Sequence, residues 1–174
     1  MERPKINKRK ITNDWQKYCP ELSKLRMLDI DNRVGSLVIG FYLQIIGDGT
    51  IYMPLYKVGN LYSHYSVLPS SLEIEGRSMD MQMHEIYSEQ IAQQLIQKAY
   101  IPLQVEVTFE DVKNGYERYF KNPNKGTIVE YEDYVYISSW TRKKELFDNA
   151  LHTVYNELKS WPEERYFVRD GGFK

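Results

Sequence analysis

The feature that most constrains the fold is a long alternating segment that ends in a glycine-rich turn. In segment 34–46, every second side chain is apolar and the side chains between them are mixed. Because successive side chains of a strand point to opposite sides, this pattern predicts a strand with one core face. Gly47, Asp48 and Gly49 supply the backbone freedom of a tight hairpin. The sequence therefore predicts an antiparallel hairpin with 50–58 as its returning strand.

The returning strand contains a proline, which limits where it can lie. Ile51, Met53 and Leu55 share one face of this strand, and Pro54 lies between them. Proline cannot donate a hydrogen bond to a sheet. We therefore expect the returning strand at an edge of the sheet, or Pro54 in a bulge.

Other segments predict short strands and three amphipathic helices. The clearest helix is 143–161, where an apolar stripe recurs every three or four residues until Pro162. Thr108, with Asp111 three residues later, resembles a capping box and predicts a second helix start. The third helix is expected at 86–100, and a helical segment around Trp15 precedes it. Further strands are expected at 72–75, 79–84, 103–107 and 127–138.

These elements predict an α+β fold. The chain has 174 residues, which is enough for one core and few for two. We expect a mainly antiparallel sheet of five to seven strands, with the three amphipathic helices packed largely on one face. Residues 12–162 are expected to form this single domain, between a basic flexible arm at 1–11 and an irregular tail at 163–174.

Charge is unevenly distributed along the chain. The first ten residues carry five cations against Glu2, a local charge of +4, and the other 164 residues carry 18 basic and 23 acidic side chains. A mildly acidic body does not favour general nucleic-acid binding. The arm supplies candidate contacts to phosphate or to an acidic partner, with a solvated terminus as the alternative. These contacts are Arg3, Lys5, Lys8, Arg9 and Lys10.

Cysteine content and hydropathy indicate the compartment. The single cysteine, Cys19, excludes an intrachain disulfide framework and is expected to be a structural thiol. The longest apolar run, 37–46, is far shorter than the roughly 20 residues of a membrane helix. No apolar stretch follows the basic N-terminus as in a signal peptide. We therefore expect a cytoplasmic protein without membrane contact.

Residue types that carry chemistry are few and scattered. His84 and Glu85 begin like a zinc-protease motif, but Ser88 holds the position of the second histidine. We expect His84 to end a strand. Asp29 and Asp31 could bind a divalent cation, although such acidic runs are more often solvated turns. We therefore assign no catalytic residue, metal or cofactor, and keep a metal-dependent hydrolase around Asp29, Asp31 and His84 as a lesser alternative.

Tyrosines are the best sequence indication of a binding surface. Tyr52, Tyr56, Tyr62 and Tyr65 fall in or beside the returning strand of the hairpin. Tyrosine offers a large contact area with a polar tip and is enriched at protein interfaces. We assign these four residues to partner binding, with ordinary strand packing as the alternative. The tyrosines of 131–136 are expected to pack within a strand.

Short motifs spread along the chain carry a resemblance to a known family. They are Val34-Gly35-Ser36-Leu37-Val38-Ile39-Gly40, Tyr52-Met53-Pro54, Asn60-Leu61, His84-Glu85-Ile86-Tyr87, Pro102-Leu103 and Gly115-Tyr116. With these motifs, residues 13–162 resemble small bacterial accessory proteins encoded beside SMC-type ATPases in Lamassu-like antiphage defence systems. The resemblance implies a non-catalytic subunit clamped to a larger ATPase. The ATP site and the nuclease then belong to the partners of this subunit. It carries over no catalytic residue.

The leading expectation is therefore a non-catalytic accessory subunit that scaffolds or regulates a protein complex in bacterial defence. The first alternative is an immunity or inhibitor protein that blocks a toxin or nuclease, because a mildly acidic body suits a basic target. The second alternative is the hydrolase named above.

Overall fold

The computed structural model describes residues 4–61, 70–104, 106–122, 128–139 and 142–161. These residues form five helices and five strands. In chain order they are α1 (Lys8–Tyr18), β1 (Ser23–Arg26), β2 (Asp29–Val34), β3 (Leu37–Ile46), β4 (Ile51–Asn60), β5 (Ser70–Glu75), α2 (Met81–Lys98), α3 (Phe109–Phe120), α4 (Ile128–Ser139) and α5 (Lys144–Lys159).

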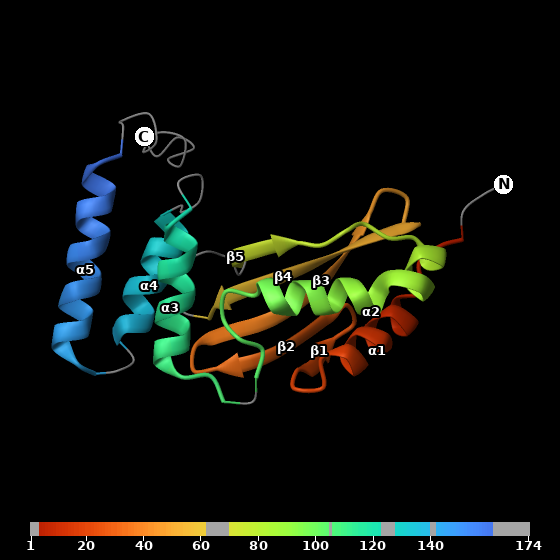
Figure 1. The fold of residues 1–174 in the computed structure, drawn as a ribbon, viewed down its shortest axis with the longest axis horizontal. Helices are drawn as coiled ribbons and strands as arrows, with labels where there is room; N and C mark the ends of the chain where they lie inside the picture. The colour runs from red at the N-terminus through yellow and green to blue at the C-terminus, as the bar shows by residue number, and fades with distance from the viewer. Residues whose placement is uncertain (1–3, 62–69, 105, 123–127, 140–141, 162–174) are drawn as a thin grey trace.

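The strands form one antiparallel sheet in the order β1-β2-β3-β4-β5, so each strand pairs with its neighbours in sequence. Figure 1 shows α1 and α2 over one face of the sheet, and α3, α4 and α5 together at one end of it. The predicted α+β fold with a mainly antiparallel sheet is confirmed. Of the three predicted helices, only α2 lies on the sheet face, because α3 and α5 pack against α4.

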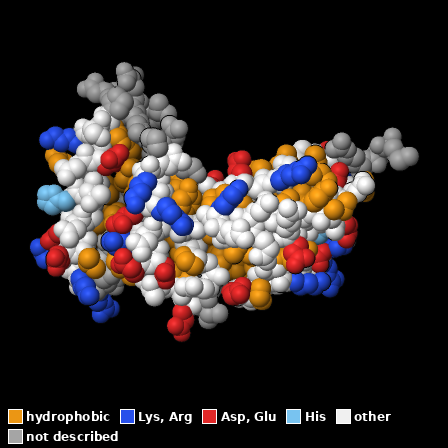
Figure 2. Space-filling model, in the orientation of Figure 1, with side chains coloured by type: hydrophobic (Ala, Val, Ile, Leu, Met, Phe, Trp, Pro, Cys, Tyr) orange, Lys and Arg blue, Asp and Glu red, His pale blue; other side chains and the backbone are white. Residues whose placement is uncertain are grey.

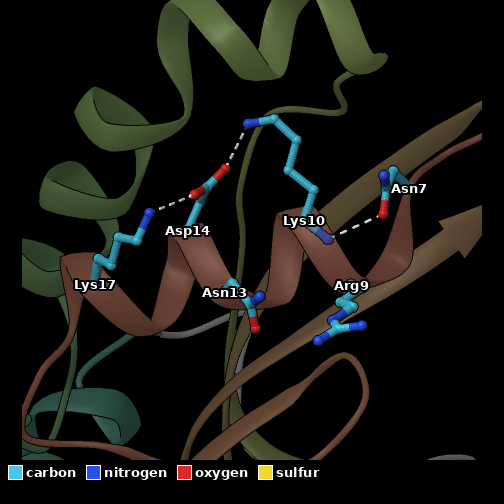
Figure 3. Close-up of a pocket in the computed structure, with 6 residues that line it drawn as sticks. All are labelled: Asn7, Arg9, Lys10, Asn13, Asp14 and Lys17. Atoms are coloured by element: carbon cyan, nitrogen blue, oxygen red, sulfur yellow. Dashed lines mark hydrogen bonds and ion pairs between the residues drawn. The ribbon is translucent and has the colours of Figure 1, made fainter.

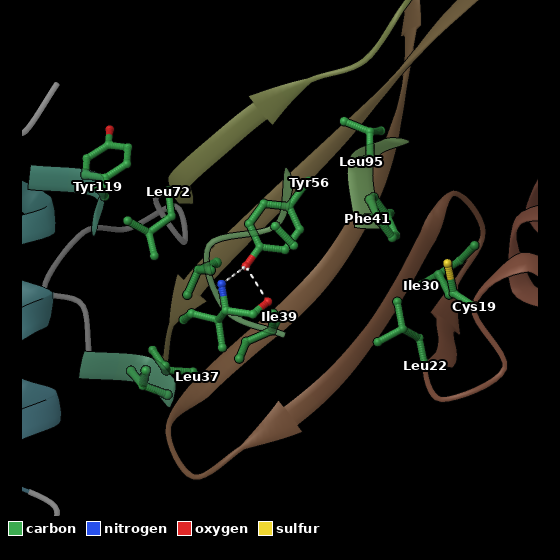
Figure 4. Close-up of a cluster of buried hydrophobic side chains, with 14 of the residues drawn as sticks. Cys19, Leu22, Ile30, Leu37, Ile39, Phe41, Tyr56, Leu72, Leu95 and Tyr119 are labelled. Atoms are coloured by element: carbon green, nitrogen blue, oxygen red, sulfur yellow. Dashed lines mark hydrogen bonds between the residues drawn. The ribbon is translucent and has the colours of Figure 1, made fainter. Parts of the chain in front are cut away.

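The core lies between the sheet and the helices above it. β3 supplies a wholly buried or half-buried apolar row that includes Phe41, as its alternation predicted. Trp15 of α1 packs on Phe41, with 5.3 Å between the ring centroids. Leu95 of α2 belongs to the same cluster (Figure 4). In the described residues, one cluster of buried apolar side chains extends from Ile6 to Trp161.

The cross-strand register decides which face each residue of β4 occupies. Tyr56 lies opposite Phe41, and Tyr52 lies opposite Ile45. Both tyrosines are fully buried in the core. The expectation that Tyr52 and Tyr56 form a partner surface is therefore corrected. A shift of one residue exchanges the two faces of a strand, and alternation within β4 alone does not show which face is inside.

Pro54 lies in an interior strand and not at an edge. It pairs with Leu43 of β3, whose N–H points the other way and donates to the carbonyl of Leu28 at 2.9 Å. On the β5 side, the N–H of Gly76 donates to the Pro54 carbonyl at 2.8 Å, just after β5 has ended at Glu75. The missing donor of Pro54 therefore falls just beyond the last pair of the β4–β5 ladder, Leu55 and Glu75.

Two segments predicted as strands have other structures. Segment 79–84 makes one isolated bridge, between Met79 and Tyr52, and then enters α2. Asp80 caps this helix by accepting a hydrogen bond from the backbone N–H three residues later. This cap outweighs the alternation of methionines and polar residues. Segment 103–107 is described except for residue 105, and its described residues contain no strand.

Segment 127–138 was predicted as strand, but its described part is helical and forms α4. Every side chain described in 129–138 is buried or half-buried, because α4 contacts α3, α5 and β5. A helix enclosed in this way lacks the polar stripe that reveals a period of 3.6 residues. Its many tyrosines and β-branched residues favour a strand by composition.

Two helix predictions are confirmed. Thr108 and Asp111 form a reciprocal capping box at the start of α3. The apolar stripe of 143–161 corresponds to α5, whose bounds differ from it by one or two residues.

The predicted basic arm, 1–11, is partly helical. α1 begins at Lys8, and its N-cap Asn7 accepts a hydrogen bond from the backbone N–H of Lys10. Ile11 is fully buried and fixes the first turns of α1 to the core. The folded domain therefore begins before residue 12, while the predicted tail, 163–174, lies outside the described residues.

Candidate functional site

The face of the sheet opposite α1 and α2 carries no helix in the described part of the chain, and we call it the helix-free face (Figure 1). Four apolar side chains on it form what we call the apolar row: Ile46, Ile51, Met53 and Leu55. Ile46 lies opposite Ile51, and Leu55 lies opposite Tyr42. Ile46, Ile51 and Met53 are half-buried and Leu55 is buried, although none of the four belongs to the core cluster. An antiparallel sheet often leaves one face to water, but that face is then normally polar.

A cluster of charges adjoins the apolar row. Lys57 of β4, which lies opposite Gly40 of β3, reaches across β3 to Asp29 of β2, with 2.9 Å between Nζ and Oδ1. Arg26 pairs with the same carboxylate. The Lys57 ammonium also lies 5.3 Å from the centre of the Tyr42 ring. The buried Asp29 carboxylate therefore already holds two cations on this face.

Asp31 lies on the same face, two residues after Asp29. It is 5% exposed, and its Oδ1 has no hydrogen-bond partner. A side-chain carbon added to Gly40 would lie 2.5 Å from this oxygen, so the carboxylate lies over Gly40. Burial raises the pKa of Asp31 to about 6, although the positive charge of Lys57 opposes the rise. The carboxylate is thus poorly compensated by its own chain.

The two predicted binding tyrosines that are described have structural partners. The Tyr56 hydroxyl donates to the carbonyl of Ile101 at 3.2 Å and accepts from the N–H of Ile101 at 3.1 Å (Figure 4). The Tyr52 hydroxyl accepts from the indole nitrogen of Trp15 at 3.1 Å. Burial raises the pKa of both phenols well above the ordinary value. The other two predicted residues lie outside the described residues: Tyr62 and Tyr65.

His84 is buried between α1, α2 and β4, and it lies in the first turn of α2 and not at a strand end. Its Nδ1 lies 2.7 Å from the Tyr52 hydroxyl, and its Nε2 lies 3.1 Å from the Asp14 carboxylate. Lys10 and Lys17 also pair with Asp14, at 2.7 and 3.2 Å. Burial alone would raise the pKa of Asp14, but hydrogen bonds from Lys10, His84 and Lys17 lower it to about 2. This network fastens α1 to α2 and the sheet.

Four of the five cations predicted to contact phosphate or an acidic partner lie at or just before the start of α1. Lys8, Arg9 and Lys10 form the first turn of α1, and Lys5 lies exposed just before it. Arg3 lies outside the described residues. Three cations at the positive end of a helix dipole are unfavourable for the helix, so a nearby anion would stabilise it.

A shallow depression of about 340 Å³ runs along α1 between the side chains of Arg9, Lys10 and Lys17 (Figure 3). Lys10 pairs with Asp14 and with Glu85, the latter at 3.1 Å. Figure 2 shows acidic and basic side chains mixed over α1. Because these charges partly cancel, α1 is a weaker candidate for a binding surface than the helix-free face.

The structure does not bring together the residues of the hydrolase alternative. Asp29 and Asp31 lie on the helix-free face, whereas His84 lies over the opposite face, and the sheet separates them. In the described ranges, no group of three or more His, Cys, Asp or Glu residues could hold a metal ion. Cys19 is buried, and burial raises its pKa to about 12, as expected for a structural thiol.

The sequence did not predict a buried polar cluster where the sheet meets α3 and α4. Asp133 accepts hydrogen bonds from the Asn60 amide at 3.0 Å and from the Tyr116 hydroxyl at 3.5 Å. The Tyr119 hydroxyl donates to Glu130 at 3.2 Å. Glu130 and Asp133 are three residues apart, which places them on one side of a helix. In a strand, residues three apart point to opposite faces, so the strand prediction did not bring Glu130 and Asp133 together.

No protein-family model matches the chain, and neither the curated proteins nor the solved structures contain a match. Across the described ranges, every helix is too short or too polar to cross a membrane. The geometry of the helix-free face is therefore the main basis for inferring function.

Proposed function

We propose that this chain is a non-catalytic accessory subunit that binds a protein partner through its helix-free face. The half-buried members of the apolar row, Ile46, Ile51 and Met53, are the observation that carries the proposal. Covering apolar surface stabilises a complex by about 25 cal/mol per Å² before the costs of association. Apolar side chains beside a charged cluster also match the apolar centre and polar rim of protein interfaces.

The β1 edge of the sheet is a weaker candidate than the helix-free face. β1 forms one edge, is only four residues long, and is exposed throughout. Its pairing with β2 shifts register between Lys24 and Arg26. Short, irregular edge strands that carry cations discourage the addition of another strand. We therefore place the partner on the face of the β3–β4 hairpin.

The resemblance to accessory proteins of Lamassu-like systems suggests which partners to test first. These are an SMC-type ATPase and a nuclease subunit of the same cytoplasmic defence complex. Any direct nucleic-acid contact would come from the cations of α1 and the residues before it. If the partner proves to be a toxin or nuclease that the chain neutralises, the immunity-protein alternative replaces the accessory-subunit proposal.

Affinity purification from the native host tests the proposal. The bait is the tagged chain as wild type, as Ile51→Ser/Met53→Ser on the helix-free face, or as Ile86→Ser/Tyr87→Ser on α2. Ile86 and Tyr87 are exposed, so the second double variant is a matched loss of apolar surface. Circular dichroism checks that each bait is folded.

The proposal predicts that one defined partner is retained by the wild type and by the α2 variant, and is lost from the helix-free-face variant. A wild-type bait that elutes as a clean monomer would contradict the proposal. Equal retention of the partner by both variants would remove the helix-free face as its binding surface.

A further inference from the structure

We infer that Asp31 is the receptor for a basic side chain, arginine or lysine, that the partner inserts into the helix-free face. The inference rests on the proposed function and names the chemistry that this face recognises. It concerns the charged cluster formed by Arg26, Asp29, Asp31 and Lys57.

One carboxylate of the charged cluster lacks a hydrogen-bond partner. Asp29 pairs with both Arg26 and Lys57, whereas Oδ1 of Asp31 has no hydrogen-bond partner although Asp31 is 95% buried. An unsatisfied buried carboxylate destabilises the protein that carries it. Departures from the rule that buried polar groups are paired are expected chiefly at functional sites. A cation from outside would supply the partner that Asp31 lacks.

The surroundings of Asp31 suit a guanidinium or an ammonium group. The carboxylate lies over Gly40, which has no side chain of its own. Tyr42 lies two residues after Gly40 on the same face of β3, and its ring already attracts the Lys57 ammonium. An arginine placed there would pair with the carboxylate and stack on the ring. The adjoining apolar row would exclude water, which strengthens the ion pair.

Access to Asp31 requires movement of one side chain. Lys57 crosses β3 beside Gly40, and its ammonium group is held at Asp29. Its side chain is 16% exposed, so it lies near the surface. Displacing this flexible chain opens the space over Gly40 without moving the backbone.

A small cation tests the site without the partner. Methylguanidinium chloride is titrated into the ¹⁵N-labelled protein, and the backbone amide shifts are followed by NMR. Saturable shifts are expected at Asp31 and Gly40 in the wild type and not in Asp31→Asn. Tetramethylammonium chloride at the same ionic strength, which cannot donate a hydrogen bond, should leave both amides unshifted. The absence of a saturable shift in the wild type overturns the inference.

A binding measurement tests the same residue against the partner that affinity purification returns. Asp31→Asn should bind at least tenfold more weakly than the wild type, and its urea midpoint at pH 7 should be equal or higher. Loss of binding without loss of stability excludes misfolding as the cause. Asp148→Asn on α5 removes a partly exposed carboxylate and should bind like the wild type.

The two proposals fail in different ways. If Asp31→Asn binds as tightly as the wild type while Ile51→Ser/Met53→Ser does not bind, the inference about Asp31 is wrong and the helix-free face remains the binding surface. If neither variant loses binding, both proposals are wrong. A lower urea midpoint for Asp31→Asn would show that the carboxylate supports the fold and would also overturn the inference.

Discussion

Replacing Tyr56 by phenylalanine tests whether this tyrosine belongs to the core or to a partner surface. The change removes the hydroxyl and keeps the ring, which packs edge-on against Phe41 with 6.1 Å between the centroids. The hydroxyl makes two hydrogen bonds with the backbone of Ile101, and Tyr56 has no exposed area. Without it, one buried N–H and one buried carbonyl of Ile101 lose their partner.

The size of the effect follows from those two groups. Leaving a buried polar group unsatisfied costs about 1–3 kcal/mol. Two such groups predict a loss of about 2–6 kcal/mol in the free energy of unfolding. In a chain of this length, each kcal/mol corresponds to about 2–4 °C in melting temperature. We therefore expect the melting temperature to fall by roughly 4–24 °C.

Urea unfolding of purified protein, followed by circular dichroism, measures this loss. Tyr42→Phe is the matched control, because Tyr42 is half-buried on the helix-free face and its hydroxyl makes no hydrogen bond in the described structure. The control should stay within about 0.5 kcal/mol of the wild type. A Tyr56→Phe protein as stable as the control would refute the assignment of Tyr56 to the core.

Three further predictions concern acid stability, thiol reactivity and close packing. Because the pKa of Asp14 falls from 3.8 to about 2 on folding, its contribution to stability is present above pH 3.8 and is lost as the pH falls towards 2. Asp14→Asn should therefore lower the urea midpoint at pH 7 and flatten its acid dependence, and an unchanged profile would count against the network around His84. Cys19 should react with Ellman's reagent at pH 8 only after unfolding; rapid reaction of the native protein would contradict its burial. Gly40→Ala should lower stability by about 1–3 kcal/mol or more, because the added carbon would lie 2.2 Å from the Ile30 carbonyl oxygen, and an unchanged melting temperature would refute this close approach.

The parts of the fold that sequence predicts well depend on local chemistry. The β3–β4 hairpin is predictable because every second residue of β3 is apolar and because Gly47 and Gly49 follow it. Both glycines have positive φ. The start of α3 follows from the reciprocal bonds of Thr108 and Asp111. In both cases the residues that specify the element lie within a few positions of each other, so no knowledge of distant contacts is needed.

The parts that sequence predicts poorly depend on contacts between distant segments. The composition of α4 favours a strand, and only the packing of α3, α5 and β5 around it shows why a helix has so little exposed polar surface. In β4, either parity could form the core. Tyr52 and Tyr56 pair with the residues of β3 that face the core, so the two tyrosines face the core as well. Trp15 and Ile101 then cover them.

The candidate site was only partly visible in the sequence for the same reason. The hairpin was identified as a binding region, but the face assigned to the partner was the wrong one for Tyr52 and Tyr56. Asp29 and Asp31 were noted as an acidic pair. The ion pair between Asp29 and Lys57 spans β3 beside Gly40, which only the register of three strands reveals.

Carbene footprinting of the chain, alone and in the complex that co-purifies with it, tests the central claim most directly. The measurement compares labelling of the β3–β4 hairpin with labelling of α2, where Ile86 and Tyr87 are exposed. The account predicts that binding reduces labelling of Ile51 and Met53 and leaves Ile86 and Tyr87 unchanged. Protection of α2 with unchanged labelling of the hairpin would show that the partner binds elsewhere and would contradict the account.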